Sequence, residues 1–303
     1  MARSLLYSRA MKSNCPPIRF NRSCCPHTGS LVRNGRFFRT SDSQYVQRWR
    51  CTNCQRTVSL ATGSPCFGQN KRRVNDPLLK LLGSGVSQRR AALILNIHPI
   101  TVARKFSFLS LLGRIRQTRY LLRFVRAPRM QVQFDEMETF EHSKMKPLSI
   151  ALAVCPMTRK ILDIQVSSIA AKGLLADQAR KKYGKRADDR AIGMRRMFEN
   201  IRPLLHEEAV LLSDQNPKYP GWLKSQQTTW RHQTVKGRRG CIVGQGELKK
   251  VGFDPLFSLN HTCAMIRANI NRLFRKTWCT TKKAERLFDH LTLYMDFHNR
   301  ELT

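Results

Sequence analysis

Three strand-like segments between residues 130 and 169 constrain the fold of this chain more than any other feature. They read MQVQFDEMETF, LSIALAVCP and KILDIQVSSI, and each is a short apolar or alternating run of the kind that forms β-strands. A turn near Met157-Thr158-Arg159 separates the last two. Because strands this close in sequence usually pair with their neighbours, the sequence predicts an antiparallel meander.

The residues after the meander alternate between helical and strand-like patterns. A charged helical stretch covers 170–205, and it is followed by a buried strand AVLLSD, a helix near PGWLKSQQ, a strand TWRHQTV and a loop VKGRRGCIVGQGE. Three antiparallel strands and then alternating helix and strand is the order of a ribonuclease H-like sheet. We therefore expect an α/β domain over residues 128–303, in which a ribonuclease H-like mixed sheet is flanked by helices.

Residues 21–75 have the pattern of a small zinc ribbon. Cys51 and Cys54 form a CxxC knuckle, and LVRNGRFFR and QYVQRWR alternate as the strands of a hairpin. Two such knuckles bind one tetrahedral Zn²⁺. The partner knuckle must lie near residue 25, where Cys24 and His27 have the right spacing and Cys25 is a competing ligand.

The remaining N-terminal residues and cysteines carry weaker signals. Thr28 stands where a regular knuckle has Cys, so a chance CxxC in a reducing compartment is the alternative to a zinc site. Residues 1–20 predict a disordered basic arm, with an organellar transit peptide as the alternative. The isolated cysteines are expected to be reduced, buried thiols: Cys155, Cys241, Cys263 and Cys279.

Residues 76–120 predict a helix-turn-helix domain. Ser87 is a good N-cap for a helix over SQRRAALIL, and Pro99 suits the first position of a second helix that runs to about Leu109. The second helix carries candidate groove or phosphate contacts, namely Thr101, Arg104 and Lys105. A small helical bundle of another kind would show a similar periodicity.

The net charge points to a polyanionic partner. The 303 residues include 55 Lys and Arg against 20 Asp and Glu, a formal charge of +35 that is spread along the chain. Nucleic acid is the usual partner for such a chain. No apolar run approaches the roughly 18 to 20 residues that span a bilayer, so we expect a soluble, cytoplasmic protein with no membrane partner. A basic ribosomal protein would share the charge, but would rarely be this long.

Two of the few carboxylates stand where a strand runs into a loop. Asp135 ends the run QVQF, and Asp214 ends the run AVLLS. Two carboxylates that converge from neighbouring strands repel each other unless a cation lies between them, and Mg²⁺ favours such oxygen ligands. Glu136 and Glu138 are supporting candidates. The alternative for either aspartate alone is a turn or capping residue.

The stretch SLNHTCAMIRANINRLFRKTW, residues 258–278, predicts a basic helix that begins at Asn260-His261. Its apolar residues 259, 263, 266, 270 and 273 form one stripe. Asn260, Arg267 and Asn271 lie on another face.

Three of these segments resemble the catalytic blocks of prokaryotic insertion-sequence transposases of the DDE type. The segments are FDEMETF at 134–140, LLSDQNPKY at 211–219 and LNHTCAMIRANINRLFRKT at 259–277, and QRWRCTNCQRTVS is similar to the family's second zinc knuckle. The closest groups have a zinc ribbon and a helix-turn-helix ahead of a ribonuclease H-like core. The resemblance implies Mg²⁺- or Mn²⁺-dependent DNA strand cleavage and transfer at element ends by a homo-oligomer, in a prokaryotic cytoplasm at the nucleoid.

Carried over by position, Asp135 and Asp214 match the first two catalytic aspartates of that family, and Arg267 matches its later basic residue. Asn260 falls where the family has Glu. An Asn can give a metal a neutral oxygen or orient water, or it can simply cap the helix. Substitutes for the missing carboxylate are Glu247, Asp254 and the softer ligand His261.

The resemblance also suggests where DNA is bound and leaves two other functions open. The zinc ribbon and helix-turn-helix would read the element ends. The helix predicted over residues 258–278 would contact DNA through Arg267, Arg275 and Lys276. A catalytically inactive DNA-binding protein derived from a transposase is the alternative. A zinc-dependent transcription regulator is the third candidate, and it has no use for paired aspartates at strand ends.

Overall fold

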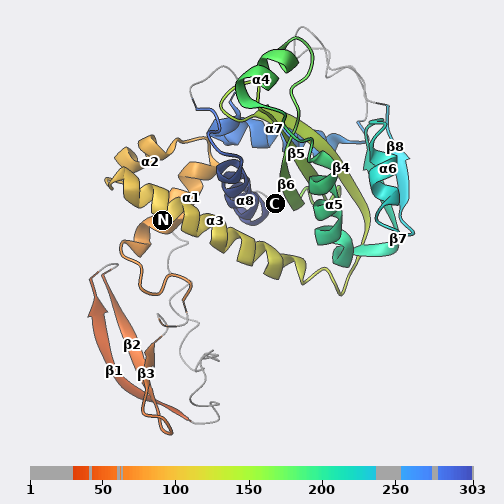
Figure 1. Cartoon of the computed structure of the whole chain (residues 1–303). Helices are drawn as coiled ribbons and strands as arrows, with labels where there is room; N and C mark the ends of the chain where they lie inside the picture. Colours follow the sequence, from red (N-terminus) through yellow and green to blue (C-terminus); the bar gives the residue numbers. More distant parts are fainter. Residues whose placement is uncertain are drawn as a thin grey trace. The chain divides into compact units, whose positions relative to one another are not determined.

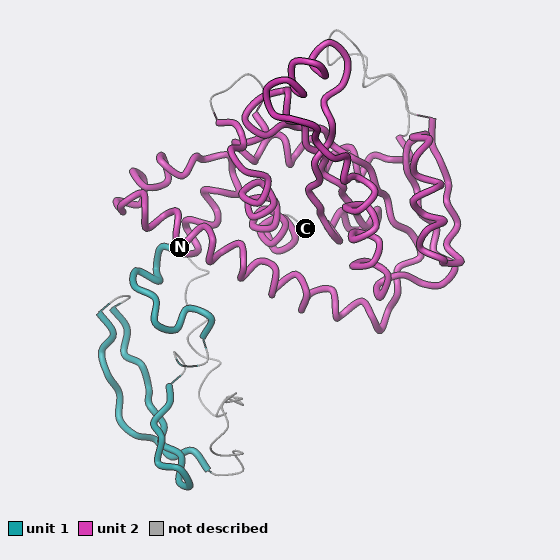
Figure 2. The backbone as a smooth tube through the Cα atoms, in the orientation of Figure 1, with its two compact units in different colours: residues 1–74 teal, residues 75–303 magenta. Residues whose placement is uncertain are grey.

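A computed structural model describes residues 30–40, 43–59, 62, 64–236, 254–274 and 279–301. The chain divides into two compact units, residues 1–74 and residues 75–303 (Figure 2). The helical segment that follows residue 75 belongs to the same unit as the sheet that follows it. Residues 1–20, with the predicted arm, lie outside the described residues.

The N-terminal unit contains a three-stranded antiparallel sheet. Its strands, in spatial order, are β1 (Leu31–Arg39), β2 (Gln44–Cys51) and β3 (Thr57–Ser59). The predicted hairpin is therefore confirmed. A bulge interrupts the β1–β2 pairing between Arg33 and Arg36, where Gly35 adopts a φ of +67° that other residues rarely take. A short 3₁₀ helix, η1 (Arg72–Val74), ends the unit.

The second unit is built on a mixed five-stranded sheet (Figure 1). Its strands are β4 (Arg129–Phe140), β5 (Pro147–Val154), β6 (Ile161–Ser168), β7 (Leu205–Ser213) and β8 (Arg231–Thr234). Their spatial order is β6-β5-β4-β7-β8, with β4–β5–β6 antiparallel and β7 and β8 parallel to β4. This confirms the meander and the two later strands, and the arrangement is compatible with a ribonuclease H-like core.

Helices cover both faces of this sheet. They are α4 (Leu175–Tyr183), α5 (Arg190–Ile201), η2 (Arg202–Leu204), α6 (Tyr219–Lys224), α7 (Phe257–Asn269), η4 (Asn271–Leu273) and α8 (Ala284–Glu301). One face packs Met137 and Ile150 against α7 and α8. The other face packs Val132 and Phe134 against α5 and α6. The sheet is thus the middle of three layers, with alternate residues of β4 facing opposite helices.

Three further helices precede the sheet: α1 (Asn75–Gly83), α2 (Gln88–Ile94) and α3 (Pro99–Leu121). Ser87 caps α2 by accepting a hydrogen bond from Arg90 N, as predicted. The structure extends the second predicted helix to Leu121 because its inner face stays apolar beyond Leu109 and packs on α8. No helix in the described part of the chain is long and apolar enough to cross a membrane.

The helical segment and the sheet are joined through α8. Buried hydrogen bonds link Gln117 of α3 to the carbonyls of Ile161 and Leu162 on β6, and Asn299 of α8 donates to Gln117 Oε1. His290 Nε2 lies 2.9 Å from Leu82 O, and burial lowers the pKa of this imidazole to about 4. A neutral imidazole can donate to this carbonyl without burying a charge, which makes α8 a fixed link between the two parts of the unit.

The predicted helix over 258–278 is wrong at both ends. It begins at Phe257 and ends at Asn269, because Ile270 leaves helical geometry with φ −105° and ψ 105°. Ile270 and Leu273 are nevertheless buried in the core with the rest of the predicted stripe. Residues 275–278 lie outside the described residues.

Close packing of α1 on α8 depends on a glycine. A Cβ on Gly83 would lie 2.6 Å from Cδ1 of the Phe297 ring, whereas a Cβ on Gly221 would meet nothing within 4 Å. We expect Gly83→Ala to reduce the free energy of unfolding by about 1–3 kcal/mol, because the ring must move out of a packed interface. Gly221→Ala is the matched control and should leave it nearly unchanged. Equal denaturant midpoints for the two variants would contradict this packing.

Candidate functional site

The sheet brings Asp135 and Asp214 to the same edge. Gln133 of β4 is paired in parallel with Leu212 of β7. Asp135 and Asp214 each stand two residues further on, so the register places them at equivalent positions just beyond the paired segment. Asp214 directly follows the end of β7, as predicted. The prediction that Asp135 also stands at a strand end was wrong, because β4 continues to Phe140 through its pairing with β5. Their carboxylates are close enough that the charge of Asp214 raises the pKa of Asp135.

The carboxylate of Asp135 is partly desolvated and firmly oriented. Its Oδ1 accepts hydrogen bonds from Tyr219 Oη at 2.9 Å and from the backbone N of Glu136 at 2.7 Å. Burial raises the pKa of Asp135, the two hydrogen bonds partly offset this, and Asp214 adds to it. Among the described residues, none donates to Asp135 Oδ2. The arrangement leaves this oxygen for a cation that would relieve the repulsion between the two aspartates.

Tyr219 is a site residue that sequence reasoning missed. It is the first residue of α6, it is almost fully buried, and its ring packs between Phe134 of β4 and Trp222. Asp214 shapes the turn that leads to it, because its Oδ1 accepts a hydrogen bond from Asn216 N at 3.1 Å. The available signal was a tyrosine that opens a helix five residues after a strand-end aspartate. Tyr219 thereby connects the two carboxylate-bearing segments.

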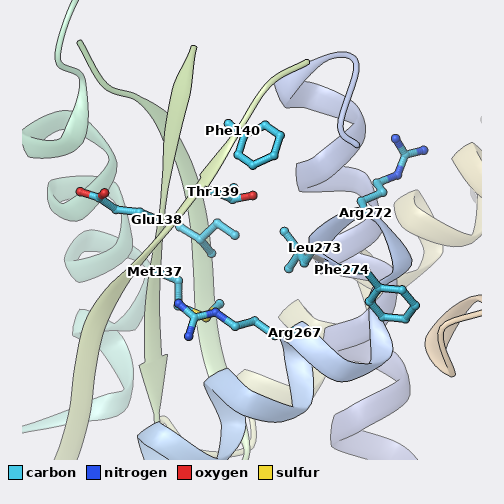
Figure 3. Close-up of a pocket in the computed structure, with 9 residues that line it drawn as sticks. Met137, Glu138, Thr139, Phe140, Arg267, Arg272, Leu273 and Phe274 are labelled. Carbon is cyan, nitrogen blue, oxygen red and sulfur yellow. The ribbon is translucent and has the colours of Figure 1, made fainter. Parts of the chain in front are cut away.

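Glu136 was predicted to support the aspartates, and the structure contradicts this. Because side chains alternate along a strand, Glu136 leaves β4 on the opposite face from Asp135. It accepts a hydrogen bond from Ser149 Oγ at 2.6 Å and lies near Arg190 of α5. The side chain of Glu138 points to that side as well (Figure 3). It forms an ion pair with Lys172.

The start of α7 is held against β4 by a single side chain. Gln133 Nε2 donates to Pro255 O at 2.7 Å, and Gln133 Oε1 accepts from Leu259 N at 3.0 Å. This double contact places the first turn of α7 beside the strand that carries Asp135. One result is that Arg267, further along α7, is close enough to lower the pKa of Asp135. Figure 3 shows the Arg267 side chain reaching from α7 toward β4 at Met137.

Asn260 lies in the first turn of α7, but it is not the N-cap. The helix begins three residues earlier, and the backbone N of Asn260 already bonds to Leu256 O. The exposed side chain donates from Nδ2 to Asp254 Oδ2 at 2.9 Å. Its Oδ1 accepts no hydrogen bond from a described residue. Positions 260, 263 and 267 share one helical face, so Asn260 lies on the face of α7 that carries Arg267.

The other candidates for a third ligand are placed as follows. Asp254 organises the start of α7, since its Oδ1 accepts from Leu256 N at 2.9 Å while its Oδ2 accepts from Asn260. His261 stacks against Phe257 and lies near His298 of α8. Glu247 lies outside the described residues. Among the described residues, no hydrogen bond joins Asn260 to Asp135 or Asp214, so its role as a third ligand stays a prediction based on its free oxygen and its helical face.

The donor set fits a hard divalent cation. Two carboxylates and one amide oxygen are the ligands that Mg²⁺ and Mn²⁺ accept, with water and substrate oxygens completing the shell. The described residues contain no cluster of three or more His, Cys, Asp and Glu side chains arranged around one metal position. The pair of aspartates is thus the acidic part of this candidate site.

The predicted zinc ligands are described only in part. Cys51 is buried and Cys54 half-buried on a tight turn, in which Gln55 N donates to Cys51 O and Gln55 has a φ of +59°. This is a suitable local shape for one knuckle of a zinc site. Cys24, Cys25 and His27 lie outside the described residues. Cys66, which the sequence left unassigned, belongs to the same unit.

The predicted DNA contacts on α3 separate into two groups. Arg104 is exposed and Thr101 is half-buried, so both are accessible. Lys105 is a correction: only 6% of it is exposed, and its Nζ donates to Asn75 Oδ1 at 2.7 Å. It falls on the face of α3 that packs against α1 and α8. Arg275 and Lys276 lie outside the described residues.

The isolated cysteines are also divided. Cys155 and Cys263 are buried, as expected, and burial raises the pKa of the Cys263 thiol to about 12. Cys279 is exposed, so that prediction was wrong. Cys241 lies outside the described residues.

Beside the aspartates, a small hollow of about 80 Å³ lies between the end of β4 and the segment that follows α7 (Figure 3). Arg267 and Arg272 line it together with the aromatic rings of Phe140 and Phe274. Burial lowers the pKa of the Arg272 guanidinium, and the nearby Arg286 adds to this. The surroundings of the site are therefore basic on the α7 side.

Compared with models of protein families and with curated proteins, the chain matches none. The fold and the site define the class of protein: a mixed α/β unit with a five-stranded sheet between helices, and two aspartates just beyond the paired segment of two neighbouring parallel strands.

Removing the Tyr219 hydroxyl should weaken cation binding at this edge. In Tyr219→Phe, Asp135 Oδ1 loses a donor that favours the ionised carboxylate, while the ring still fills its buried position. We expect the affinity for Mn²⁺, measured by calorimetry on the free protein, to fall by about tenfold. Tyr120→Phe, which removes a half-buried hydroxyl near the end of α3, is the control. Unchanged Mn²⁺ affinity in Tyr219→Phe would show that the hydrogen bond does not orient a ligand.

Proposed function

We propose that this protein is a metal-dependent DNA transposase that cleaves and transfers strands at insertion-sequence ends. The observation that carries the proposal is the pair Asp135 and Asp214, whose carboxylates interact where the pairing of β4 and β7 ends, beside the helix that carries Arg267. A chain of formal charge +35 attracts polyanions. A metal-dependent enzyme that acts on phosphodiesters needs carboxylates that bind a divalent cation. A protein that only binds DNA has no such need.

In this proposal, the reaction has two displacements at phosphorus. Water first attacks the phosphodiester at an element end, and the bond to the 3′ oxygen breaks to leave a 3′-hydroxyl. That hydroxyl then attacks a phosphodiester of target DNA and displaces its 3′ oxygen. Bound Mg²⁺ or Mn²⁺ would supply activation of the attacking oxygen and stabilisation of the leaving oxygen.

Each proposed site residue has a separate task. Asp135 and Asp214 provide the negative charge that holds a divalent ion, and Tyr219 fixes the orientation of Asp135. Asn260 would add a neutral oxygen from the first turn of α7. Arg267, exposed on the same helical face, would hold a DNA phosphate close to the aspartates.

The N-terminal parts would provide DNA recognition. A zinc ribbon held by Cys51 and Cys54, with ligands from Cys24, Cys25 or His27, and a helix-turn-helix exposing Thr101 and Arg104 would read the element ends. We further propose that the protein acts as a homo-oligomer on double-stranded DNA, at the nucleoid of a prokaryotic cytoplasm.

The second candidate is a DNA-binding protein that has lost catalysis. The observation that favours it is Asn260, an amide at the place where the family it resembles has Glu. An amide contributes no charge and accepts no proton at neutral pH. The experiments below separate the two candidates.

Replacing either aspartate should abolish cleavage and preserve binding. In Asp135→Ala and Asp214→Ala, the loss of a carboxylate removes cation affinity, so nicking of end DNA with Mg²⁺ or Mn²⁺ should fall by at least about 100-fold. Gel-shift affinity for the same DNA, measured without added Mg²⁺ or Mn²⁺ and without a chelator that would remove Zn²⁺, should be unchanged. Asp177→Ala, on the exposed surface of α4, is the control and should cleave normally. If the intact protein binds end DNA but never nicks it with either metal, the transposase proposal fails.

Asn260 can be tested apart from its hydrogen-bond partner. Asn260→Ala removes both the amide oxygen and the bond to Asp254. Asp254→Ala keeps the amide oxygen and removes that bond together with the one from Leu256 N at the start of α7. We expect nicking to fall by about tenfold or more in Asn260→Ala and clearly less in Asp254→Ala. Single-turnover cleavage at several Mg²⁺ concentrations measures both. Equal losses in the two variants would mean that Asn260 acts only by holding the start of α7.

A further inference from the structure

Helix α3 has a second apolar face that no described residue of its own unit covers. Its inner face packs on α1 and α8 through residues such as Val102, Phe106 and Leu109, which are 0–3% exposed. On the opposite side, Leu111 is 56% exposed and Ile115 is 42% exposed. At the end of the helix, Leu122 is 62% exposed. Contiguous exposed apolar side chains on one helix usually mark an interaction site.

The spacing of these residues is that of a helix seam. Leu111, Ile115, Thr118, Leu122 and Val125 follow one another at intervals of 4, 3, 4 and 3 residues. These are the a and d intervals at which one helix packs into another. Leu122 keeps right-handed helical dihedrals at φ −56° and ψ −23°, and Val125, 47% exposed, follows in the next turn. We name these five residues the α3 stripe.

A groove runs beside the C-terminal half of the α3 stripe. It encloses about 350 Å³ between α3, β6 and α8. Its apolar surface comes from Leu121 and Leu122 on the α3 side and from Ile164, Leu204 and Met295 on the other sides. Polar groups also line it, among them Gln117 of α3 and Asp163 of β6, whose carboxyl accepts hydrogen bonds from Gln165 and Asn200. A ridge of apolar side chains beside an apolar groove can accommodate one face of an amphipathic helix.

The charges around the α3 stripe select among occupants. The chain has no acidic residue between Asp76 and Asp135. Of the exposed arginines near the stripe, Arg114 pairs with Asp289. The others form no ion pair with a described residue: Arg104, Arg119, Arg123 and Arg126. A second copy of α3 would set arginines against arginines, which is unfavourable at a helix seam. DNA would satisfy the arginines but would leave the apolar side chains against a polyanion.

We propose that the α3 stripe docks an amphipathic helix of a separate protein, with apolar residues at heptad spacing and Asp or Glu on either side of them. The apolar residues would cover the stripe and enter the groove, and the acidic residues would pair with the flanking arginines. This interaction goes beyond the proposed DNA chemistry and does not depend on it, because the α3 stripe is separate from the aspartate pair.

The experiment uses the full chain and two fluorescent four-heptad peptides. Both carry Leu at positions a and d, and one has Glu and the other Lys at positions e and g. Fluorescence anisotropy at 0.15 M salt should show binding of the Glu peptide only. The triple variant Leu111→Ser, Ile115→Ser, Leu122→Ser should bind it at least about tenfold more weakly. The three substituted side chains are exposed, so the variant should remain folded, and circular dichroism checks this.

Two controls separate a specific seam from general charge attraction. The variant Met157→Ser, Leu174→Ser, Ile192→Ser removes equally exposed apolar residues elsewhere on the unit and should bind normally. The variant Arg119→Glu, Arg123→Glu should lose the Glu peptide and gain the Lys peptide. Equal binding by the wild type and the α3-stripe variant would overturn the proposal. The proposal would also be overturned if the wild type is a dimer and the same serine substitutions make it a monomer. In that case the occupant of the α3 stripe is a second copy of this chain.

Discussion

The two hydrogen bonds of Gln133 are the constraint on which the candidate site depends. Strand β4 lies at the centre of the sheet, between an antiparallel partner and a parallel one. Its register with β7 fixes Asp135 relative to Asp214, and the Gln133 amide fixes the start of α7 relative to the same strand. The strand register and the Gln133 hydrogen bonds therefore both act on residues 133–135 of β4. The amide of Gln133 is buried, so losing either bond would leave a costly unpaired polar group.

The site keeps two carboxylates close together and has few nearby groups that compensate for them. In a chain with 55 basic residues, neither Asp135 nor Asp214 forms an ion pair within 4.0 Å with a described residue. Asp135 instead accepts hydrogen bonds from a tyrosine hydroxyl and a backbone amide, while burial holds its pKa above the ordinary value. Unrelieved repulsion of this kind costs stability and favours cation binding, which is typical of functional sites. Arg190 and Asp188, by contrast, form a close ion pair on the other face of the sheet.

The features that were predicted correctly are those that a local sequence pattern determines. The meander and the closeness of Asp135 to Asp214 followed from runs of eight to twelve residues whose burial alternates or is continuous. The position of Asp135 inside β4 was missed, because pairing with β5 extends this strand to Phe140. Failures arose where tertiary contacts decide. Lys105 looked like an exposed cation, but the face of α3 is set by its packing on α1 and α8, which pairs Lys105 with Asn75. Glu136 looked like a neighbour of Asp135, but strand alternation sends it to the other layer. Tyr219 was missed because its role rests on a hydrogen bond between segments 84 residues apart, and its place five residues after Asp214 does not by itself show that partner.

In the proposed metal site, the neutral amide of Asn260 limits the number of cations that the protein side chains alone can hold. Two carboxylates carry a charge of −2, which one divalent cation neutralises. A third carboxylate would have made room for a second cation, whereas Asn260 adds an oxygen without charge. The N-terminal end of α7 is itself electropositive, and Arg267 brings a further positive charge toward Asp135. A second cation would therefore be held only when a DNA phosphate supplies the missing negative charge, so metal occupancy and substrate binding would be coupled in this protein.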